Sequence, residues 1–363
     1  MSINEETRGI SKDVLEKLLG ELNRDFIDNL PSDPSDIINF AKRRINPYIA
    51  SSLGEDLAKR MLEYRLSDKD YLLTLFKSMS VTFDLGQEPQ NNPLASILVA
   101  QTGAGKSNLR KMLILNGNGY VIIDSDLYKK YRPDAEFIRS MDATHFGALT
   151  GIDSYDHAEN IRNYTMEKGY NILMEVAPSM EKGLIGVNFE KLQQYGYDSK
   201  IHIMAVGDLV SAIAVHYRYE KTMFFSDDVG NSKLTDLHRH DESYKAVEEC
   251  IKNMDPSKIN LYVRGDKEDS LPKQIDTTGK TIDEIIQILR EERLKSNYRY
   301  ATATGENSFT EDYANIKKLM YLRKAPQEEY MQLEKIHNRY LGYLKQINQA
   351  MIKTYSVLSL EDD

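Results

Sequence analysis

The chain has 363 residues, a formal net charge of −9 at pH 7 and one cysteine, Cys250. This length exceeds that of an ordinary single core, so we expect more than one structural unit. The acidic balance, with Lys and Arg dispersed along the chain, excludes a surface built to neutralise duplex nucleic acid. One cysteine excludes a disulfide framework and a CxxC metal site and fits a reducing compartment, where Cys250 is expected to be a buried, inert thiol.

The N-terminal sequence MSINEETRGISKDVLEKLL has neither the basic start nor the apolar run of a secretory signal. No stretch approaches the roughly 18 apolar residues that cross a bilayer. We therefore expect a cytoplasmic protein with no membrane partner, although an export signal of another kind would escape this test.

Helical periodicity dominates residues 9–90, which carry almost no strand signal. Apolar residues recur at helical spacing in DVLEKLLGELNRDFIDNL, which Ser11 is placed to cap, then in PSDIINFAKRRI and in EDLAKRMLEYRLSDKDYLLTLFKSM. We expect three or four helices there. The polar stretch GQEPQNNP, residues 86–93, breaks the pattern and is typical of a linker.

From residue 95 onward, short apolar runs alternate with helical segments. Runs of this kind predict parallel strands covered on both faces, so we expect an α/β fold with a doubly wound, mainly parallel sheet. The expected strands are 95–100, 120–124, 171–175, 200–206 and 259–264. Three amphipathic helices follow after about residue 275, the last of them able to exceed 25 residues. The predicted units are 1–90, 91–275 and 276–363.

The stretch ILVAQTGAGKS fits a relaxed Walker A pattern, with Ala100 in place of the first glycine. Gly103 and Gly105 let backbone N–H groups turn toward phosphate oxygens, and the helix that starts at Lys106 adds its partial positive charge. Lys106 is expected to reach the β- and γ-phosphates and Ser107 to complete a Mg²⁺ site, so the predicted cofactors are ATP and Mg²⁺. The predicted nucleotide-binding residues are Ala100, Gln101, Thr102, Gly103, Ala104, Gly105, Lys106 and Ser107.

Three carboxylates stand at predicted strand ends, where a parallel sheet opens its crevice. Asp124 is expected to hold Mg²⁺-bound water or the loop, and Asp126 to accept a proton from the acceptor hydroxyl. The alternative for Asp126 is that it caps the following helix. Glu175, in NILMEVAPS, is placed to contact Mg²⁺ water or the substrate hydroxyl, or is an ordinary solvated carboxylate.

Phosphoryl transfer also requires positive charge over the migrating group. One segment around Gly230 supplies cations in Arg218, Lys221, Lys233, His238, Arg239 and His240. A lid that closes on the phosphates has this composition, and so does a solvated charged loop. His238 and His240 are at i, i+2 spacing on a predicted helix and point apart, so we assign them no metal role.

In this order and spacing, QTGAGKSNLR, VIIDSDLY, GYNILMEVAP, YGYDSKIHIMAV, RYE and HD resemble the zeta toxin family across roughly residues 94–265. That family contains P-loop kinases of bacterial toxin–antitoxin systems that phosphorylate UDP-N-acetylglucosamine and similar nucleotide sugars. The resemblance implies Lys106 on the phosphates, Asp126 as the base, Glu175 at the acceptor and Arg218 as a catalytic cation. It places the second catalytic arginine of the family at about Lys233.

The chain departs from the family pattern at two places. An ammonium at Lys233 cannot reproduce the two-pronged hydrogen bonding of an arginine, which implies slower transfer or a different lid geometry. Glu175-Val176-Ala177-Pro178-Ser179 stands where the family usually reads EGT, so the hydroxyl and the flexible glycine near the acceptor are lost. Another nucleotide, a dinucleotide such as NAD or a polynucleotide end stays open as acceptor. A rival of another class is a nucleotide-responsive binding protein that turns over little ATP.

The flanking helices suggest a protein partner. One hypothesis makes residues 1–90 a built-in antitoxin that covers the ATP crevice, in place of the separate helical antitoxins of the family. The alternative is a packing or oligomerisation unit, since amphipathic helices usually bury their apolar stripe in a core.

Overall fold

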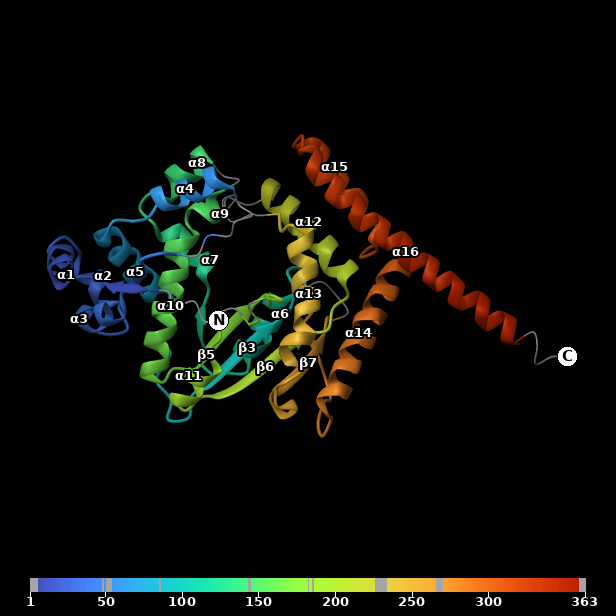
Figure 1. The fold of residues 1–363 in the computed structure, drawn as a ribbon, viewed down its shortest axis with the longest axis horizontal. Helices are drawn as coiled ribbons and strands as arrows, with labels where there is room; N and C mark the ends of the chain where they lie inside the picture. Colours follow the sequence, from blue (N-terminus) through green and yellow to red (C-terminus); the bar gives the residue numbers. More distant parts are fainter. Residues whose placement is uncertain are drawn as a thin grey trace.

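The computed structural model describes residues 6–47, 49, 54–84, 86–142, 145–181, 183–184, 186–225, 234–265 and 270–358. Its centre is a six-stranded sheet in the order β4-β5-β3-β6-β7-β8 (Figure 1). All neighbouring strands pair in parallel except β8, which is antiparallel to β7. The strands are β3 Leu94–Val99, β4 Val121–Ile123, β5 Ile172–Val176, β6 Asp198–Met204, β7 Ile259–Val263 and β8 Lys273–Ile275.

The direction of winding changes at β3. The chain leaves β3 for β4 and β5 on one side and returns to β6 and β7 on the other. Ligand crevices of doubly wound sheets open at such a reversal, beyond the carboxyl ends of the strands. The predicted doubly wound, mainly parallel sheet is confirmed, and the five predicted strands lie within two residues of their expected bounds. The short antiparallel β8, KQI, is too exposed to show a buried-strand pattern.

Helices cover both faces of the sheet (Figure 1). Two of them, α6 and α12, follow the strands that border the reversal, β3 and β6. The helices of this part are α6 Lys106–Leu115, α7 Ser125–Tyr128, α8 Ala135–Met141, α9 Phe146–Leu149, α10 Gly151–Lys168, α11 Phe189–Gln194, α12 Asp208–Phe225 and α13 Leu237–Ile251, with 3-10 turns η3 Lys129–Tyr131 and η5 Pro256–Lys258.

The N-terminal part contains more elements than the sequence predicts. Ser11 precedes the first helix but makes no side-chain cap bond, and the expected long helix breaks after Leu19. A two-stranded antiparallel sheet also forms, although its strands, TRG and KRR, are too short to show an alternating pattern. The elements are β1 Thr7–Gly9, α1 Lys12–Leu19, α2 Arg24–Asp28, α3 Pro34–Ile37, η1 Ile38–Phe40, β2 Lys42–Arg44, α4 Glu55–Glu63 and α5 Asp68–Thr82.

These N-terminal elements pack onto the sheet. Leu72 and Leu75 of α5 belong to the same apolar cluster as Ile97 of β3. Arg43 of β2 also forms a buried ion pair with Asp153 of α10, with Nη2 3.1 Å from Oδ1. A buried pair of this kind is costly to break, because separation leaves an uncompensated charge. The division of the chain at residues 90 and 275 stays a prediction, but the N-terminal helices share the core of the sheet.

Three helices follow the sheet, as predicted. They are α14 Ile282–Thr302, α15 Phe309–Leu322 and α16 Gln327–Leu358. All three pack against α12, and α16 then extends beyond the rest of the molecule (Figure 1). Within the described residues, we find no helix with the length and apolar character needed to cross a bilayer.

Candidate phosphoryl-transfer site

The loop between β3 and α6 has the conformation that its glycines predict. Gly103 has φ 80° and Gly105 has φ 93°, a left-handed region that costs other residues energy. A Cβ atom on Gly103 would collide with the carbonyl oxygen of Ser211 and lie 2.9 Å from Cγ2 of Val215. The backbone of α12 therefore packs directly on the loop at a position where only glycine fits.

Lys106 begins α6 and folds back over the loop. Its Nζ donates to the carbonyl oxygens of Ala100, at 2.9 Å, and Gln101, at 3.2 Å. Burial lowers the pKa of Lys106 to about 8; Glu175 opposes this change, and the positive charges of Arg218 and Arg239 add to it. The carboxylate and both guanidinium groups are thus close enough to act electrostatically on the lysine predicted to hold the phosphates.

Hydrogen bonds from two polar side chains, Gln101 and Arg264, fix the conformation of the phosphate loop. Gln101 is fully buried, and its Nε2 donates to the carbonyl oxygen of Val206 at 2.9 Å and to Oγ of Ser211 at 3.0 Å. Arg264, directly after β7, donates to the carbonyl oxygens of Gly103 and Ala104. Gln101 therefore contributes only its backbone to the cavity of the loop. Sequence reasoning missed Arg264, which lies far along the chain at the end of a predicted strand.

A hydrogen-bonded chain continues from the loop to the C-terminal helix. Oγ of Ser211 lies 2.9 Å from Nε2 of His240, and Nδ1 of His240 lies 2.9 Å from Oδ1 of Asp241. An ionised carboxylate only accepts, so Nδ1 of His240 donates to Asp241. Arg339 of α16 donates to both oxygens of Asp241. Burial alone would raise the pKa of Asp241, but hydrogen bonds from His240 and Arg339 bring it to about 2.

The two aspartates after β4 have different surroundings. Asp124 is the N-cap of α7, and its Oδ1 accepts from the backbone N–H of Asp126 at 3.0 Å. The alternative in which Asp126 caps this helix is therefore wrong. The Asp126 side chain is 74% exposed, and its Oδ1 lies 2.5 Å from Nζ of Lys129, a nearly buried side chain. A solvent-open carboxylate in the first turn of α7 is free to meet an acceptor.

Arg110 connects the acids of two strands to α6. Its Nη1 lies 3.1 Å from Oε1 of Glu175 and 3.9 Å from Oδ2 of Asp124. The sequence placed both acids at strand ends, and the structure brings them to the same guanidinium. Arg110 itself was missed; the available signal was its position four residues after Lys106 on one predicted helix face.

The segment that departs from the family pattern is fastened to α13. Arg239 donates to the carbonyl oxygens of Ala177, at 2.9 Å, and Pro178, at 2.8 Å. Glu242, one turn further along α13, accepts from Arg239 at 2.9 Å and from Oγ of Ser179 at 2.7 Å. The EVAPS segment is therefore held by a cation and an anion that sequence reasoning did not pair with it.

Of the two catalytic cations predicted outside the phosphate loop, the structure describes one, Arg218. Arg218 is exposed on α12, and Lys233 lies outside the described residues. Arg239 of α13, one of the cations that the sequence analysis assigned either to a lid or to a solvated charged loop, is a second cation near Lys106. In the described part of the chain, no cluster of three or more His, Cys, Asp or Glu residues is arranged to hold a metal ion. A Mg²⁺ ion held by Ser107 and Asp124 would therefore depend on phosphate oxygens and water, its usual arrangement.

Comparisons with known proteins identify a family for this chain. The family model described as zeta toxin matches residues 82–272, more than half of the chain. Toxin zeta of Enterococcus hirae and that of Streptococcus pyogenes are each 28% identical over 186 residues, which cover 49% of this chain and 63% of theirs. The chain thus spans under two thirds of the length of these relatives.

A solved structure agrees on the fold. A chain from the PezAT chromosomal toxin–antitoxin system of Streptococcus pneumoniae aligns with a TM-score of 0.50 and 17% identity, over 64% of this chain and 98% of that one. The resemblance inferred from the motifs is confirmed by the family model. This chain belongs to the zeta toxin family.

Proposed function

We propose that the protein is an ATP- and Mg²⁺-dependent kinase that phosphorylates a hydroxyl group of a small molecule, foremost a nucleotide sugar such as UDP-N-acetylglucosamine. One observation carries the proposal: Lys106 closes a Walker-type loop at the reversal point of the sheet and is under the electrostatic influence of Glu175, Arg218 and Arg239. Cations gathered around a phosphate loop suit a reaction in which charge spreads over a migrating phosphoryl group.

In this mechanism the acceptor oxygen attacks the γ-phosphorus, the bond between the γ-phosphorus and the bridging oxygen breaks, and ADP leaves. Asp126, whose carboxylate forms an ion pair with Lys129, takes the proton of the acceptor hydroxyl. Lys106, Arg218 and Lys233 stabilise the transferring group. Mg²⁺ at Ser107 and Asp124 would neutralise charge on the phosphate oxygens.

The acceptor is contacted from β5 and the segment after it. Glu175 is 27% exposed, so it can accept a hydrogen bond from an acceptor hydroxyl, with Arg110 holding its carboxylate. Incubation with ATP and a panel of nucleotide sugars, nucleotides and dinucleotides, followed by mass measurement, identifies the acceptor by the gain of one phosphate. A phosphorylated dinucleotide such as NAD, in place of UDP-N-acetylglucosamine, would reassign the substrate within the same mechanism.

Substitution of Asp126 by Asn tests the mechanism. We expect phosphoryl transfer to fall by about 10² or more while ATP affinity is retained, because only the proton acceptor is removed. Asp13→Asn, an exposed substitution on α1, serves as the matched control. An unchanged transfer rate in Asp126→Asn would refute the base assignment, and wild-type protein that binds ATP but phosphorylates nothing in the panel would favour the rival binding protein.

We further propose a toxin role with an antitoxin as partner. The PezAT relative is described as part of a toxin–antitoxin system. Inducible expression should then arrest growth for the wild type but not for Asp126→Asn at equal protein level. For residues 1–90 we favour the packing role, since the shared core around Leu72 and Ile97 predicts that their deletion yields insoluble protein. A soluble truncation with raised activity would instead support inhibition in cis.

A further inference from the structure

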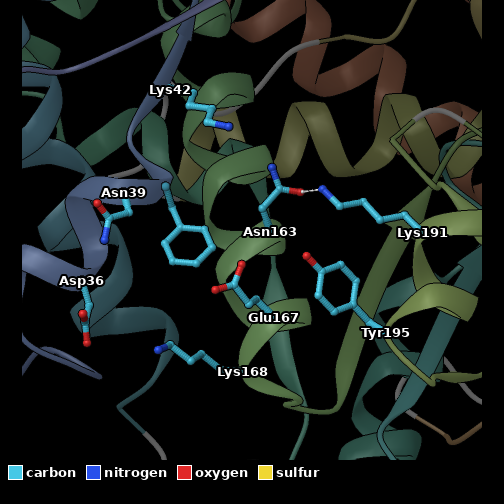
Figure 2. A pocket seen from close by; sticks show the side chains of 9 residues that line it. Asp36, Asn39, Lys42, Asn163, Glu167, Lys168, Lys191 and Tyr195 are labelled. Atoms are coloured by element: carbon cyan, nitrogen blue, oxygen red, sulfur yellow. Dashed lines mark hydrogen bonds between the residues drawn. The ribbon is translucent and has the colours of Figure 1, made fainter.

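A cavity lies where the N-terminal elements meet the sheet-bearing part of the chain. Its volume is about 270 Å³, close to the lower end, roughly 300 Å³, of ordinary ligand pockets. Figure 2 shows side chains from both parts of the chain around it. The lining residues are Asp36, Asn39, Phe40, Lys42, Asn163, Glu167, Lys168, Lys191 and Tyr195.

This cavity is remote from the phosphate loop. Asn163 and Glu167 belong to the last turns of α10, which lead into the start of β5. Lys191 belongs to α11, which leads into the start of β6. The phosphate loop follows the carboxyl end of β3, and β3, β5 and β6 are parallel, so these lining residues lie toward the opposite, amino ends of the strands. The proposed kinase reaction makes no use of these residues.

The N-terminal wall of the cavity is fixed in place. The backbone carbonyl of Lys42 accepts hydrogen bonds from Nδ2 of Asn160 at 2.8 Å and from the hydroxyl of Tyr71 at 3.0 Å. The ring of Phe40 packs edge-on against Tyr164 of α10, with ring centroids 5.3 Å apart. Both lining residues are thus anchored to the core, which keeps the cavity formed without a ligand.

One end of the cavity presents donors to an anion. Nζ of Lys191 donates to Oδ1 of Asn163 at 2.7 Å, which leaves the amide nitrogen of Asn163 directed toward the side where Lys42 lies (Figure 2). Burial lowers the pKa of Lys191; Glu159 and, to a smaller extent, Glu167 oppose this change, while the positive charges of Lys42 and Arg162 add to it. Among the described residues, neither Lys42 nor Lys191 forms an ion pair. An anion between these two ammonium groups would relieve their repulsion.

The rest of the cavity suits a ring that carries hydrogen-bond donors. Phe40 from the N-terminal part and Tyr195 from the core supply aromatic surface. The carboxylates of Asp36 and Glu167 lie toward the end away from Lys42 (Figure 2) and accept from hydroxyl or amino groups. In the described part of the chain, neither carboxylate is engaged in an ion pair.

We propose that this cavity binds a nucleoside 5′-monophosphate. The phosphate lies between Lys42, Lys191 and the Asn163 amide, the base packs on Phe40 and Tyr195, and its exocyclic groups donate to the acidic end. The ligand joins the N-terminal elements to α10 and α11, so its binding stabilises their contact. The inference does not depend on the kinase reaction.

Calorimetric titration of the full chain tests this site. Lys106→Ala serves as the parent protein, so that the phosphate loop does not contribute. AMP or UMP should bind at one equivalent and raise the melting temperature. Adding Lys42→Met and Lys191→Met should weaken binding at least about 10-fold, or about 1.4 kcal/mol. Lys245→Met, an exposed lysine of α13, is the matched control and should leave binding unchanged.

Tyr195→Ala provides a second variant, since Tyr195 is 37% exposed and its truncation is expected to leave the fold intact. It should weaken binding of the monophosphate that binds and leave binding of inorganic phosphate unaffected. Inorganic phosphate that binds as tightly as AMP and UMP would overturn recognition of the base. Failure of both monophosphates to bind, or binding undiminished by the double lysine substitution, would overturn the site altogether.

Discussion

Arg339 of α16 donates to both carboxylate oxygens of Asp241 in α13, with Nη1 2.8 Å from Oδ1. Asp241 then orients His240, which meets Ser211 on the surface of α12 that packs on the phosphate loop. Arg339 lies beyond residue 272, where the match to the family model ends. The C-terminal helix of this chain is thereby connected to a loop near residue 100 through side chains alone.

Removing this guanidinium should destabilise the fold in a pH-dependent way. The pKa of Asp241 is about 2, below the ordinary value of 3.8. The ionised carboxylate therefore adds to the free energy of unfolding above pH 3.8, and this contribution is lost as the pH falls toward 2. Arg339→Met should cost about 1 kcal/mol at pH 7, allowing for partial solvent screening. Its difference from the wild type should shrink below about pH 3.

Denaturant unfolding at several pH values measures this difference. Arg290→Met removes a more exposed pair with Glu248 and is the matched control, with an expected loss below about 0.5 kcal/mol. A loss in Arg339→Met that is independent of pH would contradict the assigned role of Asp241.

Gly103→Ala should distort the backbone of the phosphate loop. The new Cβ atom meets the Ser211 carbonyl, and the residue would have to adopt φ 80°, at a strain of about 1–2 kcal/mol. We expect ATP affinity to fall at least about 10-fold, measured by titration with a fluorescent nucleotide. Gly342→Ala in α16, where nothing lies within 4 Å of an added Cβ, is the control and should leave ATP affinity intact.

ATP affinity should decrease as pH rises through 8. Lys106 holds phosphate as an ammonium, and its pKa of about 8 means that the proton is lost in this range before ATP binds. The ATP affinity measured below pH 8 should therefore be up to about 10-fold higher than that at pH 9, since one pH unit above the pKa leaves about a tenth of the lysine protonated. Because Glu175 raises the pKa of Lys106, Glu175→Gln should shift the decline to lower pH. A profile that does not move would show that another group controls binding.

Glu242→Ala should weaken the acceptor side of the reaction alone. The substitution releases Ser179 and one bond to Arg239, and the segment after β5 then loses its fixed position. We expect the acceptor KM to rise about 3- to 10-fold, the size of one or two lost hydrogen bonds, with KM for ATP unchanged. Glu249→Ala on the same helix, which removes an exposed pair with Lys252, is the control. Equal rises in both KM values would place the effect in the fold.

Local patterns in the sequence determined much of this protein. Runs of apolar residues predicted the five parallel strands, and the spacing of Gly103, Gly105 and Lys106 predicted a phosphate loop between a strand and a helix. These features depend on neighbours within a few residues, because backbone preference and periodic burial act over one element. The two short N-terminal strands were missed for the same reason, since segments of three residues, TRG and KRR, carry no period.

Only the tertiary structure decided how the site is held. Arg239 and the EVAPS segment are about sixty residues apart, as are Ser179 and Glu242, and Gln101 lies 110 residues from Ser211. The tertiary structure also shows that Asp124 is the N-cap of α7 and that the side chain of Asp126 is open to solvent. Such pairings arise when packed strands and helices bring distant side chains into reach, and a single polar residue carries no periodic signal that names its partner.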